Sequence, residues 1–333
     1  MNLYTTLHKL CLCPSVSGRE DNIRGLLSEL IIPLADEVRV DALGNLIAKK
    51  RGCGEGESIM LCAHMDEIGF LVNFIEDSGM LRVATIGGIS MTASAYSEVV
   101  SEGGVRGVLV PNGDVKPADM KADKLYIDIG AKNKKEAEKK VAIGDFFTQR
   151  GSLIPLMGKR VAGRPLDDRI GCAVLLSIAE KLSTVETEGD VYYVFSVQEE
   201  VGCRGAMTAA FGIAPDYALC FDVTATGDTP SATPMACKLS GGAAVKIKDN
   251  SVICSEEVVT RLCHIAKVKK IPYQREILTF GGTDTSSMQL SGSGCMAGAL
   301  SIPTRYIHSG VETCDLSDVE ACVNLAVEFI KEL

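Results

Sequence analysis

From about residue 160 onward the chain alternates short apolar runs with longer amphipathic segments, and this alternation restricts the possible folds more than any other feature. Residues 191–197 and 217–221 have the apolar and aromatic character of buried strands. The segments 168–182, 256–268 and 316–330 repeat apolar residues at helical spacing. Strands and helices that alternate in this way build a sheet with helices on both faces. We therefore predict an α/β fold with a sheet flanked by helices.

The first 67 residues contain segments of the same kind. Residues 21–34 predict a helix, and residues 38–50 predict two short strands around Gly44-Asn45. Residues 58–63 form a short apolar run that is typical of a buried strand. These segments therefore belong with the later α/β part of the chain.

Residues 68–157 interrupt this pattern. Short β-prone runs alternate there with glycine and polar residues, which is typical of a small all-β unit. The charged run 132–140 mixes Lys with Glu and predicts a short exposed helix. We expect a discontinuous α/β domain made of residues 1–67 and 158–333, with 68–157 as a β-rich insertion.

Composition excludes several classes of protein. The chain has 333 residues, 46% of them hydrophobic and 23% charged, which is typical of a globular protein and not of a disordered chain. A net charge of −9 without a basic tract argues against nucleic acid as a partner. The apolar runs are too short to cross a membrane, and the N-terminus does not resemble a secretory signal. The 13 cysteines are scattered without a CxxC motif, so we expect buried thiols in a reducing cytoplasm.

Acidic residues and histidines follow the predicted strands at the points where the strands end. In open α/β sheets, ligands bind at the carboxyl ends of the strands. Histidine and carboxylate side chains without cysteine suit Zn²⁺, Co²⁺ or Mn²⁺. The residues at or near these strand ends are His64, Asp66, Glu199, Glu200, Asp222 and His308, and the pair Asp167-Asp168 precedes a helix.

Each of these signals also has a structural explanation when it is taken alone. An Asp-Asp pair at a helix start is usually a cap, and a Glu-Glu pair is usually solvated. His8 and His264 lie inside predicted helical segments and are expected to be structural. The convergence of several strand ends is what favours a metal site.

The chain also resembles metallopeptidase family M42, the glutamyl and tetrahedral aminopeptidases, some of which were once labelled endoglucanases. Eight motifs in the same order carry this resemblance over essentially the whole chain. They are Pro14-Ser15-Val16-Ser17-Gly18 with Glu20-Asp21, Val40-Asp41-Ala42-Leu43-Gly44-Asn45-Leu46, Ala63-His64-Met65-Asp66-Glu67-Ile68-Gly69, Leu166-Asp167-Asp168-Arg169, Gln198-Glu199-Glu200-Val201-Gly202, Phe221-Asp222-Val223-Thr224, Gly281-Gly282-Thr283-Asp284 and Ile302-Pro303-Thr304-Arg305-Tyr306-Ile307-His308-Ser309. Ala225 and Gly310 depart from the family pattern without replacing a ligand.

The resemblance implies a zinc-peptidase-like mixed sheet and two divalent metal ions per subunit, Zn or Co. His64 and Asp222 would bind one metal, and His308 and Glu200 the other. Asp167 would bridge the two, although the motif alone does not decide between Asp167 and Asp168. The peptide bond after the bridging Asp would be cis.

The resemblance also implies roles for two further carboxylates and for the insertion. Glu199 would be the general base for a metal-bound hydroxide, and Asp66 would hold the ring of His64. The insertion 68–157 would be a dimerisation domain, in an assembly between a dimer and a dodecamer. The substrates would be peptides with a free N-terminus, which makes the protein an aminopeptidase.

Three other functions remain open at this point. A related metal enzyme could instead remove the acyl group from an N-acyl amino acid, and blocked substrates would distinguish the two. An inactive scaffold would have no reason to retain Glu199. An endoglucanase would leave His64 and His308 unexplained, because glycosidases use two carboxylates without histidine ligands.

Overall fold

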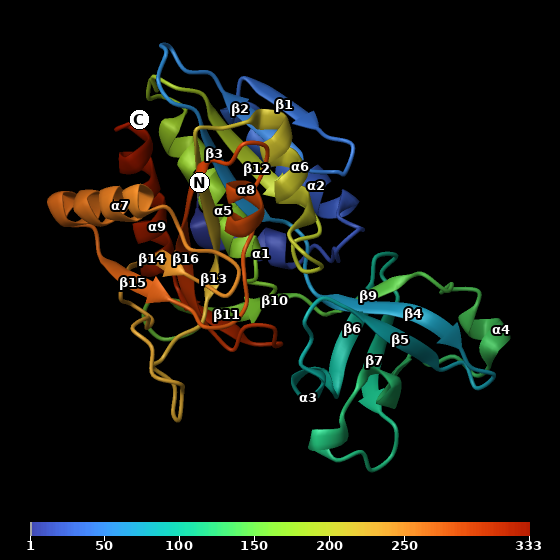
Figure 1. Ribbon diagram of the computed structural model, residues 1–333. Helices are drawn as coiled ribbons and strands as arrows, with labels where there is room; N and C mark the ends of the chain where they lie inside the picture. Colours follow the sequence, from blue (N-terminus) through green and yellow to red (C-terminus); the bar gives the residue numbers. More distant parts are fainter. Residues whose placement is uncertain (1) are drawn as a thin grey trace.

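The computed structural model describes residues 2–333, which form two parts (Figure 1). The larger part is an α/β unit around an 11-stranded mixed sheet, and the smaller is a closed β-barrel formed by the inserted segment. The predicted α/β fold, a mixed sheet flanked by helices with a β-rich insertion, is therefore confirmed.

The large sheet has a parallel centre and antiparallel edges. Its main strand order is β1-β2-β12-β3-β13-β16-β17-β11-β10, and β14 pairs with β16 and β15. The strands are β1 (Glu37–Val40), β2 (Leu46–Lys50), β3 (Ile59–His64), β10 (Ser152–Pro155), β11 (Arg160–Arg164), β12 (Val191–Ser196), β13 (Tyr217–Thr224), β14 (Ala243–Lys248), β15 (Tyr273–Ile277), β16 (Met296–Arg305) and β17 (Glu312–Asp315). Strands β12, β3, β13 and β16 run parallel, so their carboxyl ends meet at one edge.

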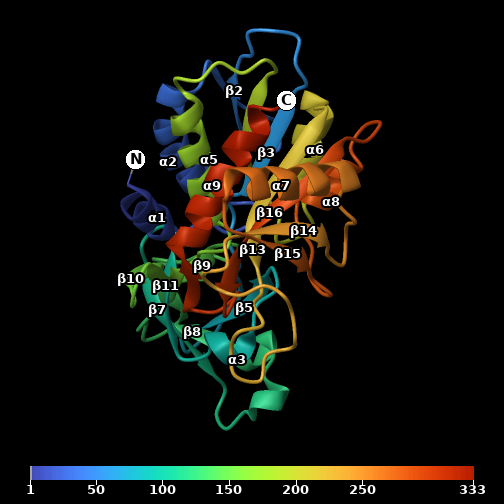
Figure 2. The same cartoon turned by 90° about the vertical axis from the view of Figure 1, so that its left-hand side faces the viewer.

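Helices cover both faces of this sheet (Figure 2). On one face α5 contacts β3 and β13 and packs against α1, α2 and α9, while α7 packs on α9 and β14. On the other face α6 contacts β12, and α8 contacts β13 and β16. The helices are α1 (Leu3–Cys11), α2 (Asp21–Ile31), α5 (Arg169–Leu182), α6 (Arg204–Ile213), α7 (Glu256–Lys269), α8 (Thr285–Gln289) and α9 (Leu316–Ile330).

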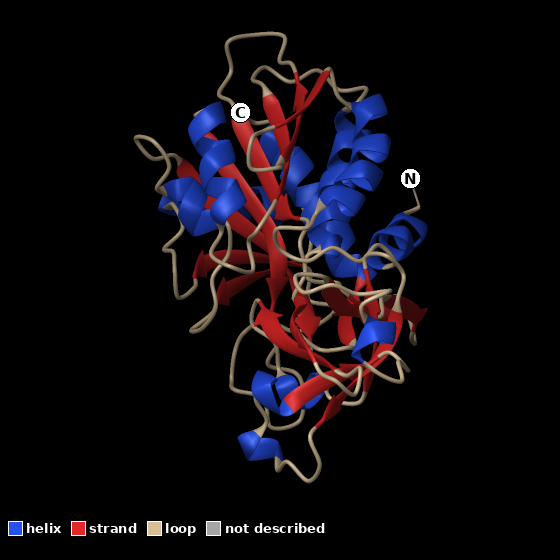
Figure 3. Cartoon of the chain, turned by 90° about the vertical axis from the view of Figure 1, so that its right-hand side faces the viewer, coloured by secondary structure: helices blue, strands red, loops and turns tan. Residues whose placement is uncertain are grey.

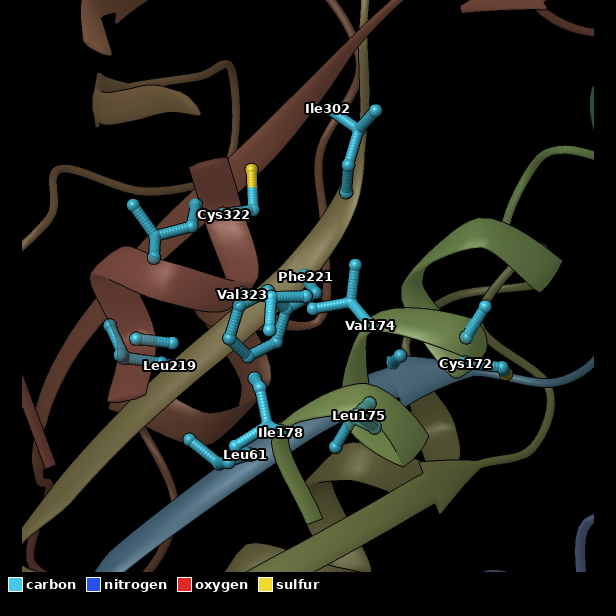
Figure 4. Packing of buried hydrophobic residues seen from close by; sticks show 14 of the residues in the cluster. Leu61, Cys172, Val174, Leu175, Ile178, Leu219, Phe221, Ile302, Cys322 and Val323 are labelled. Atoms are coloured by element: carbon cyan, nitrogen blue, oxygen red, sulfur yellow. The ribbon is translucent and has the colours of Figure 1, made fainter. Parts of the chain in front are cut away.

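The main hydrophobic core lies between the central strands and helices α5 and α9 (Figure 4). Leu61 and Leu219 from the strands meet Val174 and Ile178 from α5 and Val323 from α9. Every residue of β3 and β13 is buried, because a strand with helices on both faces has no solvent-facing side. The strands that carry the candidate site are therefore held on both faces.

The strands of the inserted segment gather below the large sheet (Figure 1 and Figure 3). They close into a barrel in the order β4-β5-β8-β7-β6-β9, with β9 returning to β4. Its interior is a separate core that includes Phe70, Val83, Val99 and Leu109. Strand β10 follows the barrel in the chain but pairs with β11 in the large sheet. The barrel strands are β4 (Gly69–Ile75), β5 (Leu81–Ile86), β6 (Ser97–Ser101), β7 (Arg106–Pro111), β8 (Leu125–Asp128) and β9 (Phe146–Gln149), with short helices α3 (Met91–Ser94) and α4 (Lys134–Ala137).

Several element ends differ from the sequence prediction. Helix α2 stops at Ile31 and continues as a 3-10 turn, Ile32–Leu34, because Pro33 has no N–H for the next helical hydrogen bond. Within the charged run 132–140, only the α4 segment is helical. Strand β13 extends to Thr224, so Asp222 lies within the strand and not beyond it.

Candidate active site

The structure brings the seven predicted site residues together at the carboxyl edge of the parallel strands. His64 is the last residue of β3, Asp222 lies near the end of β13, and Asp167 lies between β11 and α5. The Glu199-Glu200 pair follows β12, and His308 follows β16. His8 in α1 and His264 in α7 are not part of this cluster.

Two turns at this edge have left-handed backbone conformations. Gln198, directly after β12, has a φ of 57°, and His308 has a φ of 61°. Non-glycine residues rarely adopt positive φ, and such residues concentrate at functional sites. The two turns redirect the chain at the points where Glu199, Glu200 and His308 enter the cluster.

Asp167 occupies the centre of the cluster, between the two histidines. Its Oδ1 lies 3.1 Å from Nε2 of His64, and its Oδ2 lies 3.2 Å from Nε2 of His308. Glu200 places Oε1 3.3 Å from Nε2 of His308, and Asp222 places Oδ1 4.0 Å from Nε2 of His64. His308 thus faces one oxygen of Asp167 and one of Glu200, while His64 faces the other oxygen of Asp167 and, at 4.0 Å each, Asp222 and Glu199.

The neighbouring Asp168 has a different position. Its Oδ1 accepts a hydrogen bond of 3.0 Å from the backbone N–H of Gly171 and caps helix α5. Its Oδ2 is buried without a hydrogen-bond partner, and an oxygen of Asp168 lies within 4.8 Å of donor atoms of His64 and Asp222. The Asp167-Asp168 peptide bond is cis, as the resemblance implied. Only Asp167 turns an oxygen toward each histidine.

Asp66 connects His64 to the Glu199-Glu200 turn. Nδ1 of His64 lies 3.1 Å from the backbone oxygen of Asp66 and 3.5 Å from its Oδ1. The backbone N–H groups of Glu199 and Glu200 donate to the Asp66 carboxylate at 3.1 Å and 3.3 Å, and the Ser17 hydroxyl donates at 2.6 Å. Burial opposes ionisation of Asp66, but the hydrogen bond and charge of His64, together with the hydrogen bonds from Ser17 and Glu199, outweigh it and lower the pKa. Asp66 is therefore a buried anion that orients two segments of the site.

Glu312, at the start of β17, is a supporting residue that the sequence did not reveal. Its Oε2 accepts from the backbone N–H groups of Leu166 at 2.6 Å and Asp167 at 3.1 Å. Its Oε1 accepts from the backbone N–H of His308 at 2.8 Å. The sequence carries no signal for this role, because the burial of Glu312 becomes evident only in the structure.

Cys203 and Asp284 also lie beside the predicted residues. The Cys203 thiol donates to Oε1 of Glu199 at 3.2 Å. Oδ2 of Asp284 accepts from the Ser196 hydroxyl at 2.5 Å and from the Cys62 thiol at 3.5 Å. Asp284 belongs to one of the eight sequence motifs, but the motif gave no reason to place it next to Glu199.

The cluster concentrates negative charge in a small buried volume. Burial raises the pKa of Asp222 well above its usual value, and the charge of Asp167 raises it further. Burial also raises the pKa of Glu199, with Asp222 adding to the effect and His64 opposing it. Burial lowers the pKa of His308, but hydrogen bonds with Asp167 and Glu200 raise it to about 12. A cation would relieve the repulsion between these carboxylates.

The cluster opens into a cavity of about 640 Å³. Histidine and carboxylate side chains line this cavity together with threonine, serine and apolar side chains. Across residues 2–333, no helix is long and apolar enough to cross a membrane.

A buried cluster of histidines and carboxylates at the strand ends of a helix-covered sheet is characteristic of metal-dependent hydrolases. The sequence model of the M42 glutamyl aminopeptidase family matches residues 44–325 of this chain. The chain belongs to this family and is a peptide hydrolase of the aminopeptidase type.

Three similar proteins extend over nearly the whole chain. A protein of Acetivibrio thermocellus that bears the name aminopeptidase is 46% identical over 332 residues, covering 99% of this chain and 98% of that protein. Aminopeptidase APDkam598 of Desulfurococcus kamchatkensis has a TM-score of 0.95 at 38% identity, covering 99% and 95% of the two chains. The TET1 peptidase of Pyrococcus horikoshii, which can assemble into a tetrahedron or a large octahedral shell, has a TM-score of 0.90 at 36% identity and 100% coverage of both.

Proposed function

We propose that the protein is a dinuclear-metal aminopeptidase that removes N-terminal residues from peptides. His64 and Asp222 would hold one divalent cation, and His308 and Glu200 would hold the other. Asp167 would bridge them. The observation that carries this proposal is that the two carboxylate oxygens of Asp167 face Nε2 of different histidines, at 3.1 Å and 3.2 Å.

The donor set fits two cations in its chemistry. Imidazole nitrogen and carboxylate oxygen are suitable ligands for Zn²⁺ and Co²⁺. Oε1 of Glu200 is buried and faces Nε2 of His308 at 3.3 Å, so a cation held by these two atoms would relieve the cost of burying the carboxylate. Three ligand carboxylates would offset most of the charge of two divalent ions.

The bound cations, Glu199 and Asp66 would then have separate roles in hydrolysis. Bound cations would supply polarisation of the substrate carbonyl and a lowered pKa for the attacking water. Glu199 would accept the proton of that water and donate it to the leaving amine. Asp66 would keep Nδ1 of His64 oriented, so that Nε2 points to the centre of the site.

The inserted barrel suits a role in assembly. We propose that residues 68–157 form a dimerisation domain and that the protein is a homo-oligomer, from a dimer to a dodecamer. The exposed side chains of Tyr96, Val108 and Ile143 on this part support the proposal, as does the assembly of the TET1 relative. A cytoplasmic location and the absence of a nucleic-acid partner remain predictions.

Metal removal and replacement test the proposal. Dialysis against a chelator should abolish hydrolysis of aminoacyl p-nitroanilides, and Zn²⁺ or Co²⁺ should restore it. The same compounds with an acetylated N-terminus are the control, because an aminopeptidase should leave them intact and a deacylase should not. Full activity in protein shown by elemental analysis to be metal-free would refute the dinuclear mechanism.

A further inference from the structure

We propose that the enzyme selects substrates with an uncharged N-terminal side chain, and that it disfavours glutamyl substrates most. This inference rests on the proposed aminopeptidase function and concerns the wall of the same cavity. It departs from the name of the family, which refers to glutamyl substrates.

The cavity wall offers an uncharged surface to the substrate. Away from the histidines and carboxylates, it is formed by residues that include Thr224, Thr226, Ser251, Leu278 and Phe280. The side chain of Leu278 is 8% exposed and that of Phe280 is 56% exposed, so the wall offers a substrate one largely buried and one exposed apolar side chain. Hydroxyl, methyl and apolar groups of this kind suit a side chain of intermediate size without a charge.

A substrate carboxylate would find no free cation on this wall. Apart from the two histidines, Arg305 is the one basic residue among the described residues that line the cavity. Its guanidinium is already bound to Asp228 in a two-point ion pair, with Nε to Oδ1 at 3.0 Å and a terminal nitrogen to Oδ2 at 2.7 Å. Bidentate pairs of this kind are strong, so Asp228 already compensates the charge of Arg305, and Arg305 offers little attraction to a glutamyl side chain.

The charges behind the wall also oppose an acidic side chain. Lys246 is completely buried, contacts Glu276, and lies 3.7 Å from Asp249. Glu276 accepts from the Thr224 hydroxyl at 2.8 Å, and Asp249 accepts from the Ser251 hydroxyl at 2.8 Å. One ammonium faces two carboxylates, so these three side chains carry a net charge of 1 − 2 = −1 and disfavour a third carboxylate beside them.

A basic side chain would find no carboxylate on the wall either. Asp228 is held by Arg305 and also accepts the backbone N–H of Leu239 at 3.1 Å. A lysyl ammonium would therefore lose part of its hydration without gaining a partner, which is unfavourable. The negative layer behind the wall lessens this penalty, so lysyl substrates should rank between uncharged and glutamyl ones.

The test is a panel of leucyl, methionyl, lysyl and glutamyl p-nitroanilides, assayed on the assembled protein with Zn²⁺ and with Co²⁺. We expect kcat/KM for the leucyl and methionyl compounds to exceed that for the glutamyl compound by at least about tenfold, with the lysyl compound between them. Equal or faster hydrolysis of the glutamyl or lysyl compound would overturn the inference but leave the aminopeptidase function intact. No hydrolysis of any compound in metal-loaded protein would refute the proposed function, and the inference with it.

Two variants of Leu278 test whether this wall binds the side chain. Leu278→Lys should raise the ratio of glutamyl to leucyl kcat/KM at least about tenfold. Leu278→Glu should raise the ratio of lysyl to leucyl kcat/KM by the same factor. Ile277→Lys is the matched control, because Ile277 is the adjacent residue, is 55% exposed and does not line the cavity. Ratios that stay unchanged in active Leu278 variants, or that change equally in Ile277→Lys, would overturn the assignment of this wall.

Discussion

Replacing Glu199 with Gln isolates the proton-transfer step that we assign to this residue. Oε1 of Glu199 accepts a hydrogen bond from the Cys203 thiol at 3.2 Å, and Oε2 lies 4.0 Å from Nε2 of His64. Gln has nearly the same shape, and its carbonyl oxygen can still accept from Cys203. Its amide cannot take a proton from water, so Glu199→Gln should preserve the site but remove the base.

The expected loss in kcat depends on whether a neighbouring carboxylate can replace Glu199 as the base. General acid–base catalysis contributes about 10²–10⁴-fold, or ~2.7–5.4 kcal/mol at 1.36 kcal/mol per decade. The adjacent Glu200 faces His308 at 3.3 Å, and Asp284 accepts from Ser196 and Cys62. Neither carboxylate is placed to take over from Glu199, so the loss should lie in the upper half of this range.

Elemental analysis and steady-state kinetics on the same preparations distinguish the base from a ligand. Glu199→Gln should keep both metals and a KM close to that of the parent enzyme, with kcat reduced. The comparison variant is Glu200→Gln, which should lose metal from the site near His308. The assignment is refuted if Glu199→Gln turns over at nearly the parent rate, or if it loses metal while Glu200→Gln does not.

Two further predictions concern proton balance and assembly. In the protein without cations, hydrogen bonds with Asp167 and Glu200 raise the pKa of His308 to about 12, so His308 carries a proton at neutral pH that a metal must displace. Zn²⁺ binding should therefore release protons, and its affinity should fall as the pH falls. Titration calorimetry in buffers of different ionisation enthalpy measures the number of protons released. Binding without proton release would contradict this prediction. The apolar side chains exposed on the barrel should be covered by a second subunit. Light scattering at micromolar concentration should therefore report a dimer or a larger species. A monomer of 35.4 kDa would be inconsistent with the proposed assembly.

The α/β architecture could be predicted from the sequence because the central strands are buried on both faces. Strands β3 and β13 read as continuous apolar runs, and helix α5 repeats apolar residues at helical spacing. Closure of the insertion into a barrel could not be predicted, since closure depends on the pairing of β9 with β4 across more than 60 residues of chain. Hydrophobic periodicity identifies a strand but does not show which other strand it pairs with.

Two residues that support the site, Glu312 and Cys203, could not be assigned from the sequence for a related reason. The predicted ligands have side chains with metal-binding chemistry at strand ends, which the sequence displays. Glu312 acts instead by accepting backbone N–H groups of Asp167 and His308, and a backbone donor has no signature in the sequence. Cys203 is one of 13 scattered cysteines, and nothing in the sequence shows that its left-handed backbone conformation accompanies a contact with Glu199.

The supporting carboxylates explain how strand ends far apart in the chain keep a common geometry. Asp66 binds the backbone of the Glu199-Glu200 turn while it faces His64, so it couples the end of β3 to the end of β12. Glu312 binds the backbone next to Asp167 and at His308, so it couples the start of α5 to the turn after β16. Asp222 is not held by either carboxylate, but it lies inside the fully buried strand β13, where the sheet fixes its backbone. Every proposed ligand is therefore positioned by backbone contacts, which do not depend on a bound cation.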